Sequence, residues 1–279
     1  VASGIGGGSS DAAATLRALA RLWVTGLQAY LPWHGGPWEE LSEMAFEDRL
    51  NAIRDDAFIA RLVAYAKENA PRTSPELVYY MGSGDKPDYV AGPDESLKAI
   101  AEKLNEHPAE TFIRISSQAD GRALFTSRAL NRSLDALAKA LSSEFCLPGL
   151  GDAGAHVCQV MDAGWTTFVM THWHRETGLY SLAEAIRRLT SAPARIIGLE
   201  DRGTLEPGKK ADLNILKLAE LSERMPEIVH DLPGSAPRFI QKARVYRATI
   251  CNGQVILEND QHTGVRAGAV LRRANVRTM

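Results

Sequence analysis

The sequence predicts an α/β fold in which helices alternate with short strands, followed by a β-rich tail. Residues 76–81, which are followed by Gly82, and residues 147–151, which end in Gly151, are short runs of the kind typical of buried strands. After Gly203 the pattern changes to strand-like alternation, and Asn252-Gly253 is a strong hairpin turn signal. Helices alternating with strands indicate βα units and a parallel sheet. Amphipathic helices are expected to begin at Ser96, at Pro108, at Asn131 or Ser133, and at Ser181.

The composition is that of a soluble globular protein, with 279 residues, 45% hydrophobic residues and a net charge of −2. The near-neutral balance gives no electrostatic argument for binding nucleic acid or an anionic membrane. No apolar run reaches the ~20 residues of a transmembrane helix, and no secretory signal pattern opens the chain. Cys146, Cys158 and Cys251 are odd in number and widely spaced, as is typical of reduced thiols. We therefore expect a cytoplasmic protein.

Residues 147–157 contain the main candidate site. A short apolar run from Leu147 ends in glycine, and Asp152 and His156 follow it. A strand there would bring both side chains to its carboxyl end, where the ligand sites of α/β folds collect. The alternative is a glycine-rich turn in which Asp152 is a capping residue.

The downstream sequence carries a family resemblance. Its landmarks, in order, are residues 181–199, 201–212, 230–238, 251–253 and 262–272. Together they resemble the closing segment of the amidohydrolase superfamily, in particular its N-acyl-D-amino-acid deacylase (D-aminoacylase) branch. The resemblance covers residues 145–273 well and residues 30–145 loosely.

This resemblance implies the C-terminal part of a (β/α)8 TIM-like metal-dependent hydrolase barrel, with a small β-rich, sandwich-type tail. A complete barrel takes ~250 residues by itself, so we expect a C-terminal fragment or a fusion. The expected division is an N-terminal segment over residues 1–23, a partial barrel over residues 24–202 and a β-rich module over residues 203–279.

The resemblance also implies the chemistry. Amide hydrolysis needs an activated water and a polarised carbonyl, which Zn²⁺ or another divalent metal supplies in this family. Asp152 would be the metal ligand and the general base at the end of the eighth barrel strand. The family's histidines and its bridging Cys or carboxylated Lys have no counterpart on earlier strands here. We therefore expect little activity and no tightly bound metal from this chain alone.

The expected partner is a small-molecule amide substrate, with an N-acyl-D-amino acid as the form used by this branch. The branch follows its aspartate with a loop that ends in a carboxylate-binding arginine, and residues 157–164 depart from that pattern. Arg175 is a candidate replacement or an ordinary surface arginine. His156 is a candidate substrate contact or a residue that orders the loop. A related amide or a cyclic amide stays open as the substrate.

The pair His172 and His174 has the spacing of a metal-binding His-x-His motif. On a strand both rings would share a face. The surrounding pattern is helical, and residues two apart do not face together on a helix. We therefore expect surface or packing roles for both, as for His34 in a glycine- and proline-rich loop.

The first 23 residues suggest a different function. A glycine-rich loop runs into an alanine- and leucine-rich stretch that is expected to be a helix, and amides at a helix N-terminus favour phosphate. The stretch resembles the phosphate-binding loop of the GHMP kinases, most closely the kinase acting on diphosphocytidyl-methylerythritol. The alternative function is therefore an ATP-binding small-molecule kinase, and the competing interpretation is a vestigial capped helix. The phosphate-binding residues would be Gly6, Gly7, Gly8, Ser9 and Ser10.

A third hypothesis is a non-catalytic relic with a partly folded barrel portion. Unpaired edges of a partial parallel sheet favour association, so the sequence allows a homo-oligomer.

Overall fold

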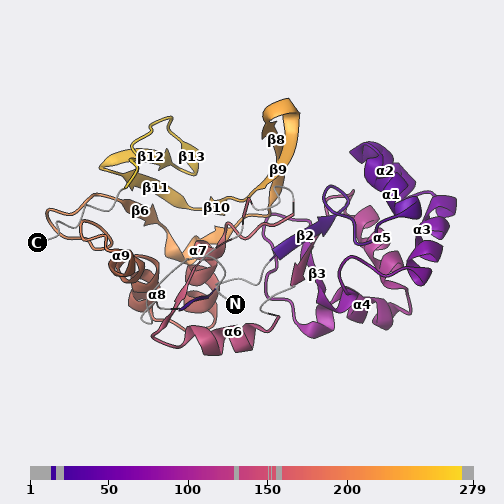
Figure 1. The fold of residues 1–279 in the computed structure, drawn as a ribbon, viewed down its shortest axis with the longest axis horizontal. Helices are drawn as coiled ribbons and strands as arrows, with labels where there is room; N and C mark the ends of the chain where they lie inside the picture. Colours follow the sequence, from indigo (N-terminus) through magenta and orange to yellow (C-terminus); the bar gives the residue numbers. More distant parts are fainter. Residues whose placement is uncertain are drawn as a thin grey trace, which may run out of the picture.

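The computed structural model describes residues 14–16, 22–128, 132–149, 151, 153–154 and 159–271 of a mixed α/β fold (Figure 1). Its helices are α1 (Gly36–Glu43), α2 (Phe46–Ala52), α3 (Asp56–Glu68), α4 (Leu97–Leu104), α5 (Pro108–Gln118), α6 (Leu134–Leu141), α7 (Trp165–Phe168), the π-helix η3 (Val169–Glu176), α8 (Leu182–Leu189) and α9 (Ser191–Ile197). Its strands are β1 (Ala14–Leu16), β2 (Leu22–Gly26), β3 (Val78–Gly82), β4 (Leu124–Arg128), β5 (Cys146–Pro148), β6 (Leu213–Leu216), β7 (Ser222–Glu223), β8 (Glu227–Leu232), β9 (Ala236–Ile240), β10 (Ala243–Arg244), β11 (Tyr246–Cys251), β12 (Gln254–Glu258) and β13 (Gln261–His262). Short 3-10 turns are η1 (Pro75–Leu77), η2 (Pro93–Glu95), η4 (Leu218–Glu220) and η5 (Pro233–Ser235).

A three-stranded antiparallel sheet, in the order β2–β4–β3, separates two hydrophobic cores. Successive side chains of a strand point to opposite faces, and the central strand β4 uses this alternation. Leu124 packs into one core and Phe125 into the other. Every residue of β4 is buried. The sheet is therefore shared by the two halves of the molecule.

The helical core lies on one side of this sheet and contains side chains from α1, α2, α3, α4 and α5. Trp38 is fully buried, and its indole N–H donates to the carbonyl of Leu62 at 3.0 Å, so its polar atom is satisfied. The rings of Phe112 and Phe125 pack with their centroids 5.0 Å apart. These contacts fix the helices seen at one end of Figure 1.

The central core lies on the other side of the sheet. It combines side chains from α6, α7, η3 and α8 with side chains from the β-rich tail. Phe168 and Trp173 come from the helical segment, and Leu221 and Phe239 come from the tail. The tail is thus packed against the helices that follow the candidate site.

The β-rich tail begins at β6. Strands β13, β12, β11 and β6 form an antiparallel sheet, and β8 and β9 form a hairpin that projects from the body in Figure 1. Asn252 and Gly253 have φ angles of 47° and 77°, as the predicted hairpin turn requires. The predicted β-rich character after Gly203 is confirmed, although Leu205 lies outside any strand.

Three predicted helix starts are confirmed by capping hydrogen bonds. A serine hydroxyl oxygen at the N-cap accepts from a backbone N–H that has no partner inside the helix. Helices α4, α6 and α8 therefore begin at the residues that local sequence indicates. The Oγ atoms of Ser96, Ser133 and Ser181 accept from the N–H groups of Ala99, Ala136 and Glu184, respectively.

The predicted parallel sheet is wrong for β2, β4 and β3, which pair in antiparallel fashion. Along the chain, β4 lies between β3 and the strand that precedes Asp152, and it pairs with β3. β4 was not recognised because Thr126, Ser127 and Arg128 make it look polar, although all are buried. The described strands form sheets of two to four strands, and the expected barrel stays a prediction.

The helix predicted after the N-terminal glycine loop is wrong where the structure describes that region. Ala14–Leu16 form β1, which pairs in parallel with β5, and Leu22–Gly26 form β2, which pairs with β4. Alanine and leucine favour helix, but intrinsic propensity is a weak determinant, and strand pairing in the folded chain overrides it here.

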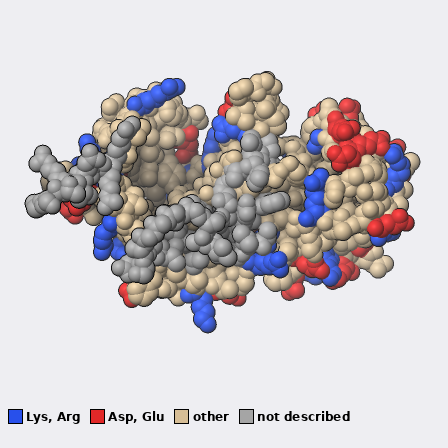
Figure 2. All heavy atoms as spheres, viewed as in Figure 1, with Lys and Arg blue, Asp and Glu red and all other residues tan. Residues whose placement is uncertain are grey.

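The surface is mixed in charge. Figure 2 shows Asp and Glu side chains gathered at the end of the molecule that contains α1 and α2, with Lys and Arg side chains scattered over the same face. Within the described ranges, no helix has both the length and the apolar character needed to cross a bilayer.

Candidate functional site

The chain that leads into the candidate site is held by Arg188 of α8, which is only 4% exposed. Its Nη1 donates to the carbonyl oxygens of Leu141 and Ser143, both at 3.0 Å, and of Cys146 at 2.5 Å. Its Nε donates to Oε1 of Glu184 at 2.5 Å. One guanidinium therefore fixes the turn between α6 and β5, directly before the predicted site.

Asp152 and His156, the predicted catalytic residue and substrate contact, lie outside the described residues, as does Cys158. The residues on either side of Asp152 are described. The backbone N–H of Ala153 donates to Oδ1 of Asp162 at 2.7 Å. A Cβ atom at Gly151 would lie 3.1 Å from the same oxygen, so glycine permits this close approach.

Asp162 is the residue that sequence reasoning missed. It is 1% exposed, and it holds the loop that carries Asp152. The signal in the sequence was an aspartate directly after the apolar pair Val160 and Met161, both of which are buried. A carboxylate in an apolar run is usually buried with hydrogen-bond partners.

Gln241 joins three segments that are far apart in the chain. Its Oε1 accepts from the backbone N–H of Gly164 at 3.0 Å, and its Nε2 donates to the Tyr89 hydroxyl at 2.5 Å and to the Arg224 carbonyl at 3.0 Å. Burial raises the pKa of Tyr89 far above its ordinary value, so this hydroxyl stays neutral. This amide links the end of the candidate loop to the loop after β3 and to the β-rich tail.

A cavity of about 460 Å³ lies beside the candidate loop. Ala153 and Gly154 form one wall, and β9 forms another through Arg238 and Phe239. Arg238 holds Asp231 with two hydrogen bonds of 2.6 and 2.7 Å, which lower the pKa of that carboxyl. The cavity therefore combines apolar surface with one guanidinium, next to the two residues that follow Asp152 in the sequence.

Arg175, the predicted carboxylate-binding residue, lies on η3 and is already engaged. Its Nη1 donates to the carbonyl oxygens of Leu218 and Leu221 at 3.1 and 2.7 Å. Its Nη2 lies 3.6 Å from Oε1 of Glu176. These contacts attach η3 to the tail, and the residues that line the cavity beside Ala153 and Gly154 do not include Arg175.

His172 and His174 lie on one π-helix and have different surroundings. The His172 ring stacks on Phe168 with centroids 4.7 Å apart, while Nδ1 of His174 lies 3.0 Å from the Tyr180 carbonyl oxygen. His34 is exposed. Across the described part of the chain, no three His, Cys, Asp or Glu side chains are grouped as metal ligands. These residues alone therefore do not fit a zinc site.

The predicted phosphate-binding residues, Gly6 to Ser10, lie outside the described residues. The helix that the kinase hypothesis needs behind this loop is contradicted at Ala14–Leu16, which form a strand. A phosphate site at a helix N-terminus depends on that helix.

The mixed α/β fold, with a glycine-rich loop after a buried strand, agrees with the result of a family comparison. The sequence model of the Amidohydrolase family matches residues 6–257, most of the chain. The chain therefore belongs to the amidohydrolase family.

Two curated sequences are similar to parts of the chain. A D-aminoacylase from Alcaligenes xylosoxydans xylosoxydans is 29% identical over 111 residues, which are 39% of this chain and 21% of that protein. A dihydroorotase from Endomicrobium trichonymphae is 44% identical over 43 residues, which are 15% of this chain and 10% of that protein. The chain thus spans a small part of each.

Two solved structures are also similar. A D-aminoacylase structure has 20% identity and a TM-score of 0.42, with 79% of this chain and 46% of that one covered. A zinc-containing N-acyl-D-glutamate deacylase from Bordetella bronchiseptica has 21% identity and a TM-score of 0.40, with 71% and 38% covered.

Proposed function

We propose that this chain serves the metal-dependent hydrolysis of an amide carbon–nitrogen bond in a small molecule, with N-acyl-D-amino acids as the substrate class. The observation that carries the proposal is the family match over residues 6–257. The position of Asp152 supports it, because the residue follows a buried strand and its neighbours Ala153 and Gly154 line a cavity.

Asp152 would take the proton from the attacking water and pass it to the departing nitrogen. An unperturbed aspartate has a pKa of about 3.9 and is a weak base toward ordinary water. A bound divalent metal such as zinc supplies the acidified water and the Lewis acidity for the carbonyl. Among the described residues, no group of three His, Cys, Asp or Glu side chains could hold such a metal.

Asp162 and Gln241 would position the catalytic loop. Asp162 fixes the backbone on the C-terminal side of Asp152, and Gln241 fixes Gly164 farther along. Catalysis depends on such constraints, because small displacements of reacting groups cost large factors in rate.

The first prediction concerns Asp152→Asn. We expect slow, zinc-dependent turnover of N-acetyl-D-methionine or N-acetyl-D-glutamate by the purified chain, at least about 100-fold lower in the variant because the proton acceptor is lost. Release of the free amino acid measures the rate. Asp94→Asn removes an exposed carboxylate in η2 and is the matched control.

Two results would contradict this proposal. One is equal turnover by the Asp152→Asn variant and the unmodified chain. The other is the absence of turnover of every amide tested with zinc present. Dihydroorotate is tested as a cyclic amide. Turnover of that compound alone would change the proposed substrate class from N-acyl-D-amino acids to cyclic amides.

The second prediction concerns the substrate carboxylate. His156 and Arg175 remain the contacts proposed from sequence, but Arg238 lines the cavity beside the loop. Its ion pair with Asp231 is exposed, so water screens it and a substrate carboxylate can compete. We expect Arg238→Gln to raise KM for N-acetyl-D-methionine about tenfold with little change in kcat, and Arg175→Gln to lower thermal stability instead. An unchanged KM in Arg238→Gln would contradict the assignment.

A further inference from the structure

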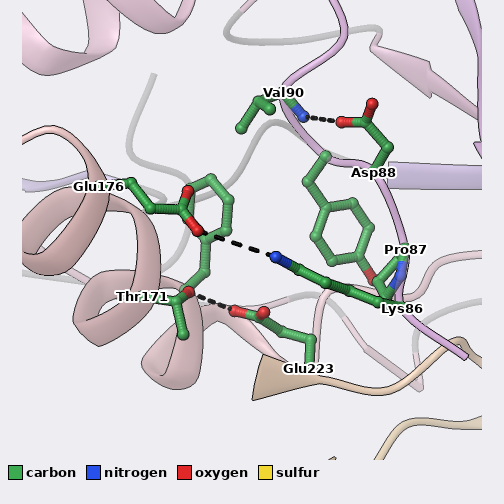
Figure 3. A pocket seen from close by; sticks show the side chains of 9 residues that line it. Lys86, Pro87, Asp88, Val90, Thr171, Glu176 and Glu223 are labelled. Carbon is green, nitrogen blue, oxygen red and sulfur yellow. Dashed lines mark hydrogen bonds and ion pairs between the residues drawn. The ribbon is translucent and has the colours of Figure 1, made fainter. Parts of the chain in front are cut away.

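A second cavity, of about 320 Å³, lies between the loop that follows β3, the π-helix η3 and strand β7 (Figure 3). Its volume is near the lower end of the ~300–1,000 Å³ that small-molecule sites occupy. The rings of Tyr89 and Phe168 line it and meet nearly edge to face, with centroids 6.2 Å apart and an interplanar angle of 76°. This cavity and the cavity beside the candidate loop have no lining residue in common, although the Tyr89 hydroxyl accepts from Gln241, which lines the other cavity.

Glu223 of β7 lines this cavity although its side chain is buried, with 3% exposure. Its Oε1 accepts from the Thr171 hydroxyl at 2.8 Å, and a backbone hydrogen bond within Glu223 itself also acts to lower the pKa of this carboxyl. Burial raises the pKa of the Glu223 carboxyl because the charged form lacks full compensation. A buried carboxyl with spare acceptor capacity is costly unless something binds it.

The cavity mouth holds an ammonium group of the chain itself. Figure 3 shows the Lys86 side chain reaching across the cavity toward Glu176, and Nζ lies 3.8 Å from Oε1 of that residue. The side chains of Lys86 and Glu176 are 57% and 41% exposed, so the pair is weak and can be displaced. The Lys86 charge also acts to lower the pKa of Glu223. The position of this group indicates where a cation would lie.

The charges around the cavity favour a cation over an anion. Asp88, Glu176 and Glu223 line it, against Lys86 alone. Oδ1 of Asp88 already accepts from the backbone N–H groups of Val90 and Ala91 at 2.8 and 3.1 Å. Glu223 and Glu176 are therefore the carboxylates for a ligand, although Glu176 also lies 3.2 Å from Nδ1 of His172 and 3.6 Å from Nη2 of Arg175.

We propose that this cavity binds a small organic cation, a primary ammonium on an apolar body, with its N–H groups donating to Glu223 and Glu176. The apolar body lies against Tyr89 and Phe168. Charge-assisted hydrogen bonds are stronger than neutral ones, and aromatic faces attract ammonium groups. The ligand takes the place of the Lys86 ammonium at the mouth. This site is independent of the proposed amide hydrolysis.

The test is calorimetric titration of the full chain with benzylammonium and with benzyl alcohol, its neutral counterpart of similar shape. We expect the alcohol to bind at least about tenfold more weakly, because it lacks the charge. Equal binding of the two compounds would overturn the proposal, since the cavity would then recognise only the apolar body. The proposal would also be overturned if benzylammonium bound neither the unmodified chain nor the Lys86→Met variant.

Three variants test the contacts one by one. Glu223→Gln and Glu176→Gln are each expected to weaken benzylammonium binding about tenfold. Lys86→Met is expected to strengthen it several-fold, because the competing ammonium is gone. Glu176 and Lys86 are exposed, so their variants are expected to fold. If Glu223→Gln fails to fold, these two variants still test the proposed cation site. Glu68→Gln and Lys67→Met, exposed positions on α3, are the controls that change charge away from the cavity.

Discussion

At the scale of single residues, Arg188 and Glu184 hold the entry to the candidate loop. Arg188 bonds three backbone carbonyls before and in β5, and its guanidinium lies 4.7 Å from the Tyr180 ring centroid. The planar fork of arginine suits several acceptors at once, which lysine cannot match. Glu184 supplies the counter-charge from one turn earlier on α8.

This pair leads to the third prediction, on pH dependence. Hydrogen bonds from Arg187 and Arg188 hold the pKa of Glu184 at about 2, below the ordinary 4.5. A lowered folded-state pKa contributes stability above pH ~4.5 that is lost as the pH falls toward 2. We expect Glu184→Gln to lower the free energy of unfolding at pH 7 by about 1–2 kcal/mol, reduced from the full value by partial solvent exposure.

Urea unfolding between pH 7 and pH 3 measures this effect. The difference between Glu184→Gln and the unmodified chain should shrink below pH ~4.5, because the glutamate is then protonated in the unfolded state. A difference that stays constant over the whole range would contradict the ion-pair explanation.

The candidate site was only partly predictable from its residues. Asp152 stands out because a glycine-rich stretch with a carboxylate follows an apolar run, a local signal. Gln241 could not be found in this way, since its partners Gly164 and Tyr89 are 77 and 152 positions away. An amide that joins remote segments has no pattern in its own neighbourhood.

At the scale of elements, the contact between the N-terminus of α7 and the tail is closely packed around Gly164. This glycine has an ordinary φ of −75°, so the backbone itself would accept alanine. A Cβ atom there would lie 2.9 Å from Oε1 of Gln241 and 3.3 Å from Cγ of Glu223. A side chain at position 164 therefore requires Gln241 to move.

The fourth prediction follows from this contact between α7 and the tail. Gly164→Ala should lower the free energy of unfolding by about 1–3 kcal/mol, as overpacking does in closely packed regions. Gly84→Ala is the matched control, because a Cβ atom there meets nothing within 4 Å. Thermal and urea unfolding of both variants measure the effect. Equal stability of the two variants would show that Gln241 moves aside freely.

At the scale of the whole molecule, the sheet β2–β4–β3 couples the two cores. Phe125 of β4 is fully buried in the helical core, while its neighbour Leu124 packs into the central core. Because β4 contributes side chains to both cores, its unpairing exposes both. We therefore expect the two cores to unfold together.

The fifth prediction tests this coupling. Phe125→Ala should lower the free energy of unfolding by about 3–5 kcal/mol, and both cores should still unfold together. Hydrogen exchange in denaturant, followed separately around Trp38 and Trp173, measures the two cores. Phe145→Ala is the control, because that side chain is 70% exposed and its loss should change stability by less than about 0.5 kcal/mol. Separate midpoints for the two regions would contradict a shared sheet.

By itself, the sequence determined the features that depend on near neighbours. Serine caps start α4, α6 and α8, Asn252-Gly253 turns the last hairpin, and the family landmarks place the chain among the amidohydrolases. Tertiary structure alone decided the strand status of the N-terminal stretch, the antiparallel direction of β4 and the burial of Asp162 and Glu223. The physical reason is range: caps and turns act within about four residues, whereas strand pairing and burial depend on segments that meet only when the chain folds.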